Sequence, residues 1–194
     1  MITFNSLIVT DEPAAEPVLK ADVKLQLRLD GTDSDTMIDN LILAARQAVE
    51  AILKKKLITT GVRVGFDILP ALISLPLAPV SSITSVTYID DDDVTQTLSS
   101  ALYNTDLESE PARIAIDEDS SYPTPANRPG AVKVNYIVGY GATAADVPQA
   151  IKQAIISVAI DLFEHPELTA EIALNKNRTS MFMLNSYRNC ATVM

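Results

Sequence analysis

The stretch from Arg128 to His165 constrains the fold most, because it joins a strand to a helix and both are apolar enough to need covering. Valine or tyrosine stands at every second position from Val132 to Val138, and this period of two predicts a β-strand with one apolar face. Gly139 and Gly141 then end the strand. The rest of the chain has to supply layers that cover these two elements.

The helix of this stretch is predicted from its start signal and its apolar period. Asp146 stands two residues before Pro148, which indicates a capped start with proline in the first turn. Apolar residues then recur at steps of three and four, as on one face of a helix that ends near Pro166. They are Ile151, Ala154, Ile155, Val158, Ala159, Leu162 and Phe163.

A second apolar stripe predicts another long helix, from about Asp35 to Lys54. Its members are Ile38, Leu41, Ile42, Ala45, Ala48, Val49 and Ile52. The two stripes are the best candidates to pack together. A shorter helix is predicted from about Leu19 to Leu29.

The middle of the chain is rich in β-branched residues and turns, so it predicts strands joined as hairpins. The expected strands are Val62–Phe66, Ile83–Ile89, Val94–Leu98, Ala101–Leu107 and Ala112–Ile116. Asp90 to Asp93 form the exposed tip of one hairpin. Because helices and strands are segregated, the predicted class is α+β: a mainly helical core of two long packed helices and a short one, with a β-rich insertion of hairpins between the second and the last long helix.

The expected organisation has three parts. Residues 1–18 form an extended N-terminal arm, residues 19–165 form the core domain with its β-rich middle at 59–138, and residues 166–194 form a C-terminal tail. Within the tail, residues 167–174 are a candidate helix, whereas residues 175–194 show no clear period.

Charge and cysteine content narrow the possible functions. The chain has 25 acidic and 15 basic residues, and its net charge of −10 has the wrong sign for gripping phosphates. The one basic run, Lys54 to Lys56, suits a helix C-terminus. Cys190 is the only cysteine, which excludes an intrachain disulfide and favours a reducing compartment. No basic segment precedes the apolar Leu7–Val9, so we expect no signal peptide. The long helix carries Lys152, Gln153 and Asp161 among its apolar residues, so we expect no membrane span and a soluble cytoplasmic chain.

The motifs that could carry chemistry are all weak. Gly139 to Ala144 fits the loose dinucleotide pattern G-x-G-x-x-G/A, but no second strand follows the helix to carry a ribose-binding acid. His165 is the only histidine and no G-x-S-x-G turn accompanies it. Cys190 has no evident activating environment. The acidic groups at Asp90–Asp93 and Asp30–Asp35 lack the spacing of a calcium loop. We therefore predict no enzyme and no catalytic residue, cofactor or metal, with a metal-dependent hydrolase or ligand-binding domain as the less favoured alternative.

Several segments resemble, in the same order, the head-tail connector (adaptor) proteins of tailed bacteriophages, over most of residues 13–165. These segments are Pro13-Ala14-Ala15-Glu16-Pro17-Val18, Leu27-Arg28-Leu29-Asp30, the helix from Asp35 to Glu50, Leu75-Pro76-Leu77-Ala78-Pro79-Val80, Ser85 to Asp90, Tyr103, Glu110-Pro111-Ala112-Arg113-Ile114, and Arg128 to Gly141. Two places depart from the family pattern. Lys54 to Lys56 stand where glycine is expected after the second helix, and Ser186 stands where the closing motif usually has proline.

The resemblance implies a structural virion protein that forms a ring of about twelve copies below the portal. Such a ring would extend the DNA channel and join head to tail at the head-tail interface of the virion, after assembly in the host bacterial cytoplasm. The implied partners are further copies of the chain, the portal, and a downstream stopper or tail-completion protein, while double-stranded DNA passes through without specific binding. A tail-completion or neck protein that does not contact the portal is the alternative.

Candidate contacts with the portal or a neighbouring copy lie in the tail. They are Met181, Phe182, Met183, Leu184, Tyr187 and Arg188. These residues include apolar groups without a clear period, as in segments that fold on binding, so we expect the tail to order on meeting the portal. The alternative is that the apolar residues pack onto their own subunit.

Overall fold

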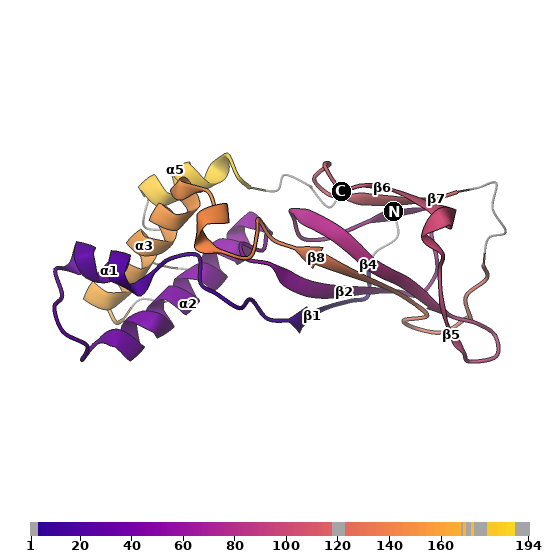
Figure 1. Ribbon diagram of the computed structural model, residues 1–194, viewed down its shortest axis with the longest axis horizontal. Helices are drawn as coiled ribbons and strands as arrows, with labels where there is room; N and C mark the ends of the chain where they lie inside the picture. The colour runs from indigo at the N-terminus through magenta and orange to yellow at the C-terminus, as the bar shows by residue number, and fades with distance from the viewer. Residues whose placement is uncertain (1–3, 118–122, 168, 170–171, 173–177, 189–194) are drawn as a thin grey trace. The chain divides into compact units, whose positions relative to one another are not determined.

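The structure is a computed structural model that describes residues 4–117, 123–167, 169, 172 and 178–188 of the 194-residue chain (Figure 1). Contacts divide the described residues into two compact units. Residues 4–12 and 59–139 form what we call the β unit, and residues 13–58 and 140–188 form the helical unit. None of the described helices has the length and apolar composition needed to cross a membrane.

The helical unit contains α1 (Lys20–Leu27), α2 (Asp35–Leu53), α3 (Gln149–Glu164) and α5 (Arg178–Asn185). The two predicted stripes do pack together, because α2 lies against α3 and both supply the same core. Helix α5 covers another part of α3, and α1 contacts both long helices. The fully buried core residues of α2 and α3 include Ile38, Ala45, Val49, Leu53, Ile151, Ala154, Ile155, Val158 and Ala159.

The β unit contains two antiparallel sheets. The larger has the strand order β1 (Ser6–Asp11), β2 (Thr60–Phe66), β8 (Val132–Val138), β4 (Val80–Ile89) and β5 (Thr95–Thr97). The smaller has the order β3 (Leu72–Ser74), β7 (Arg113–Ile116) and β6 (Tyr103–Asp106). One face of the larger sheet and residues of the smaller one share a core that includes Val64, Phe66, Ile73, Ile114, Val134 and Tyr136.

The strand predictions are largely confirmed. The alternating stretch is β8, with the predicted bounds, and it lies between β2 and β4 (Figure 1). Strands β4 and β5 pair across the four aspartates, and β6 and β7 pair across the turn at Glu108 to Pro111, as expected. Two short 3-10 helices, η1 (Ser100–Leu102) and η2 (Ala144–Asp146), complete the described elements.

The structure differs from the sequence prediction in four respects. The fold is α+β, but helix and strand are roughly balanced rather than mainly helical. The arm contains β1, which pairs with β2, because an extended segment can satisfy its backbone groups at a sheet edge. The tail contains α5, because its short apolar side is buried. Asp146 ends η2 and is not the N-cap of α3, which is Pro148. The candidate helix at 167–174 and Cys190 lie largely or wholly outside the described residues.

Candidate interaction sites

A buried charge network ties the segment before α1 to the end of α2. Arg46 Nε donates to Glu16 Oε2 over 2.8 Å, and its Nη1 lies 3.4 Å from both carboxylate oxygens of Glu50. Lys56 Nζ donates to Glu50 Oε2 over 2.7 Å, and the backbone N–H of Leu57 donates to Glu50 Oε1 over 3.2 Å. Arg46 and Glu50 are both about 5% exposed, so this network is structural rather than available to a ligand.

The three lysines after α2 do not form a basic patch. Lys54 adopts the left-handed conformation, with φ of 53°, and its N–H donates to the Glu50 carbonyl, so the helix ends where the family pattern expects glycine. Lys55 is buried with its Nζ 5.9 Å from the centroid of the Tyr140 ring. Lys56 is held by Glu50. The run is therefore part of the fold of the helical unit, not a phosphate-binding site.

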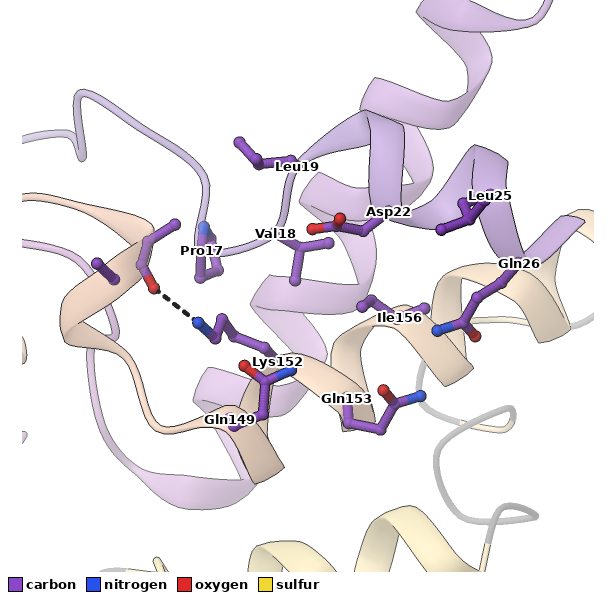
Figure 2. Close-up of a pocket in the computed structure, with 12 residues that line it drawn as sticks. Pro17, Val18, Leu19, Asp22, Leu25, Gln26, Gln149, Lys152, Gln153 and Ile156 are labelled. Atoms are coloured by element: carbon purple, nitrogen blue, oxygen red, sulfur yellow. Dashed lines mark hydrogen bonds between the residues drawn. The ribbon is translucent and has the colours of Figure 1, made fainter. Parts of the chain in front are cut away.

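A groove lies between the segment that leads into α1 and the start of α3 (Figure 2). Its volume is 490 Å³. Its lining residues are Pro17, Val18, Leu19, Asp22, Leu25, Gln26, Ala144, Ala145, Gln149, Lys152, Gln153 and Ile156. Val18 and Ile156 are buried, whereas Leu19 and Leu25 are 60% and 79% exposed. Lys152 Nζ donates to the Ala144 carbonyl over 3.1 Å, as the dashed line shows. Apolar and amide groups of this kind suit contact with another chain rather than chemistry.

The predicted tail contacts lie on different sides of α5. Leu184 is 1% exposed and belongs to the core of the helical unit, with Met181 and Tyr187 packed against that core. Phe182 is 80% exposed, and Arg188 is also exposed. Met183 is half-buried. The structure thus brings part of the predicted set into the subunit's own core and leaves Phe182 as its large exposed apolar group.

The glycine-rich turn after β8 has a structural explanation. Gly139 has φ of +123°, which side chains rarely tolerate, and a Cβ added at Gly141 would lie 2.4 Å from Asp146 Cγ. Asp146 Oδ2 accepts from both the N–H and the hydroxyl of Thr143 at 2.9 and 2.8 Å, and these bonds lower the Asp146 pKa. Because β8 pairs antiparallel on both sides, the turn lacks the parallel βαβ context of a dinucleotide site.

The acidic hairpin tip is the turn Asp90–Asp93. Asp90 Oδ1 accepts from the N–H groups of Asp92 and Val94, and Asp90 Oδ2 accepts from Gln96 Nε2 over 2.8 Å. These bonds lower the Asp90 pKa, with the Gln96 bond as the largest cause. Asp93 has φ of 62° and pairs with Arg128. Among the described residues, no group of three or more histidine, cysteine, aspartate or glutamate side chains could hold a metal ion.

One surface was missed by sequence reasoning, namely the face of the larger sheet that points away from the core. Arg63 of β2 and Lys133 of β8 are exposed there. Arg63 Nε donates to Asn135 Oδ1 over 2.8 Å, and Asn135 Nδ2 donates to Ser85 Oγ over 2.9 Å, so a chain of hydrogen bonds crosses three strands. The alternation within β2 and β8 carried the signal, since the non-core positions of each strand share this face.

Comparison with protein families finds that part of this chain is similar to phage head-tail connector proteins. The match is to the family model described as "Phage gp6-like head-tail connector protein" and spans residues 21–112, from α1 to the turn before β7. This match confirms the resemblance to head-tail connector proteins seen in the sequence. Comparison with curated proteins finds no match.

Solved structures share the fold over nearly the whole chain. A chain in the "Virion of native gene transfer agent (GTA) particle" is 21% identical with a TM-score of 0.77, over 95% of this chain and 96% of that chain. A chain in the "Neck of empty GTA particle computed with C6 symmetry" is 20% identical with a TM-score of 0.72, over 89% and 94%. A chain in the "Neck of native GTA particle computed with C12 symmetry" is 20% identical with a TM-score of 0.63, over 94% and 95%.

Proposed function

We propose that this protein is a structural virion component that assembles as a ring in the neck of a phage-like particle and joins head to tail. The observation that carries the proposal is the connector-family match over residues 21–112. The likeness to chains from particle necks described with C12 and C6 symmetry supports a cyclic assembly of about twelve copies. A ring of this kind uses two different patches on every copy and closes at a fixed rotation.

The distribution of charge is compatible with a DNA channel through the ring. Residues 4–12 and 59–139 contain 13 acidic and four basic residues, so they carry nine of the ten net negative charges. Acidic groups repel phosphates and would let double-stranded DNA pass without being held.

We further propose that α5 contacts the portal through its exposed side. Phe182 is the natural anchor because a largely exposed aromatic ring gains most from burial in a partner's pocket. Arg188 lies a short distance along the chain and is also exposed. Leu184 is excluded from this role, since its burial in the subunit core leaves no surface to bury in a partner.

The first test is the solution mass by light scattering over a concentration series. We expect a species near twelve times the 20.9 kDa chain mass, either for the chain alone or after portal is added. A chain that remains monomeric in both conditions would contradict the ring. Binding to purified portal, with Phe182→Ser compared against exposed Arg178→Ser, then separates a portal-contacting connector from a neck or tail-completion protein that assembles without contacting the portal.

A further inference from the structure

The β unit has four basic residues, of which, within the described part of the chain, Arg113 and Arg128 form ion pairs and Arg63 and Lys133 do not. Arg113 Nη2 lies 2.7 Å from Asp106 Oδ2, and Arg128 Nη1 lies 2.5 Å from Asp93 Oδ1. Neither Arg63 nor Lys133 has a carboxylate within 4 Å among the described residues. These two exposed cations can therefore pair with carboxylates of another chain.

These two unpaired cations sit together on one sheet face. Lys133 pairs with Gly65 in the register of β8 and β2, and Arg63 lies two residues from Gly65 on the same strand, so the two side chains are diagonal neighbours. Like charges at this spacing repel each other. The Arg63–Asn135–Ser85 hydrogen bonds nevertheless hold the guanidinium in place. We call the exposed positions Arg63 and Lys133, with Asn135 and Ser85, the open face.

The acidic hairpin tip has the complementary feature, namely carboxylates without a cation partner in the part of the chain that the structure describes. Asp90 uses both carboxylate oxygens to close the turn, and Asp93 is taken by Arg128. Asp91 and Asp92 are exposed, and their carboxylates have no ion-pair partner among the described residues. The turn is therefore held in shape by its own hydrogen bonds while two adjacent carboxylates remain available. Such a preorganised tip loses little conformational entropy when it binds.

We propose that, in the ring, the acidic hairpin tip of one copy docks on the open face of the next copy, with Asp91 and Asp92 opposite Arg63 and Lys133. The inference rests on the proposed ring. It supplies the two different patches that a head-to-tail contact requires, and it matches two available carboxylates to two available cations. A second copy is favoured over DNA as the occupant, because the net negative charge of the β unit opposes phosphate binding.

The experiment is ring assembly of the full chain, measured by light scattering as the protein concentration at half-assembly, at low and high salt. The variants are Arg63→Glu/Lys133→Glu, Asp91→Lys/Asp92→Lys, and the combination of all four. A control matched to the tip variant, Asp30→Lys/Asp33→Lys, makes the same charge change as Asp91→Lys/Asp92→Lys at exposed positions in the helical unit. Circular dichroism checks that every variant is folded. Asp91→Asn/Asp92→Asn serves as a milder form of the tip change.

We expect each reversal to raise the half-assembly concentration by about tenfold or more, since two exposed ion pairs become two repulsions at every contact. The combined variant should restore assembly, the control should leave it unchanged, and salt should weaken the wild type more than the Asn variant. Unchanged assembly in both reversals, or no restoration in the combination, would overturn the contact while leaving the ring. The contact would also be overturned if duplex DNA bound the wild type but not the Arg63→Glu/Lys133→Glu variant, because the open face would then be a DNA contact. A wild-type chain that forms no ring refutes the proposed function itself, and this contact falls with it.

Discussion

Glu50 is the residue whose removal we expect to damage the helical unit most. Its carboxylate lies beside the Arg46 guanidinium, binds Lys56, and accepts the buried N–H of Leu57, which would otherwise have no acceptor after the chain leaves α2. Replacement by alanine leaves that N–H without its acceptor, at a cost of about 1–3 kcal/mol. It also removes one carboxylate from a buried guanidinium. Breaking a buried ion pair by deleting one partner costs about 3–5 kcal/mol in all, and we expect Glu50→Ala to lower the free energy of unfolding by this amount.

Glu50→Gln separates the two causes. Glutamine keeps an oxygen that can accept from the Leu57 N–H but has no charge for Arg46 and Lys56, so it should cost about 1–2 kcal/mol. Glu164 is the matched control, because it is an exposed glutamate at the end of α3, and Glu164→Ala should change stability by less than about 0.5 kcal/mol.

Urea denaturation followed by far-UV circular dichroism measures these differences. A loss below about 1 kcal/mol for Glu50→Ala would refute the claim that the network stabilises the end of α2. If Glu50→Gln were as damaging as Glu50→Ala, the charge rather than the Leu57 hydrogen bond would be the main cause.

Three further predictions concern single residues. Lys54→Gly should raise the free energy of unfolding by about 0.5–1 kcal/mol. Glycine removes the cost of the left-handed conformation, and this gain exceeds the extra chain entropy that glycine loses on folding. A destabilised variant in urea denaturation would contradict this prediction. Leu184→Ala should cost about 2–5 kcal/mol in the same assay, whereas Phe182→Ala should cost less than about 0.5 kcal/mol, and equal effects would mean that α5 does not dock as described. The Ser109 hydroxyl, followed by the Arg113 guanidinium, lowers the pKa of Asp106 to about 2. The ionised Asp106 carboxylate therefore stabilises the fold above its usual pKa of 3.8, and this stabilisation is lost as the pH falls toward 2. Carboxyl carbon NMR titration should find that value in the folded protein, and a midpoint at or above 3.8 would rule the interaction out.

The local residue pattern was sufficient to predict the elements that bury one long regular face. The period of two over Val132–Val138 predicts β8 with its observed bounds, and the stripes at 35–54 and 151–163 predict α2, α3 and their packing. These elements are specified redundantly, since many residues along each one give the same signal. The connector resemblance had the same origin, because it was carried by segments spread along most of the chain.

Two short elements, α5 and β1, escaped prediction because few of their residues are buried. Helix α5 has only Ser180 and Leu184 fully buried, too few to give a recognisable period, and it is stabilised by the surface of α3 rather than by its own sequence. From the sequence alone, β1 is predicted as an extended arm, because its backbone hydrogen-bond partners lie on β2. In both cases the deciding partner lies far away along the chain.

The sequence by itself determined the α+β class, the resemblance to head-tail connectors, the long helices, the main strands and the excess of acid. Only the tertiary structure decided which charges are available. In the sequence, the four consecutive aspartates cannot be told apart from one another, and neither can the four cations of the β unit. The fold, however, uses Asp90 to close a turn and pairs Asp93 and Asp106 with arginines. The pairing of β2 with β8 sets Arg63 and Lys133 side by side on an uncovered face. The physical reason is that hydrogen bonds and ion pairs depend on distances of a few ångströms between residues up to about seventy positions apart, which sequence spacing cannot supply.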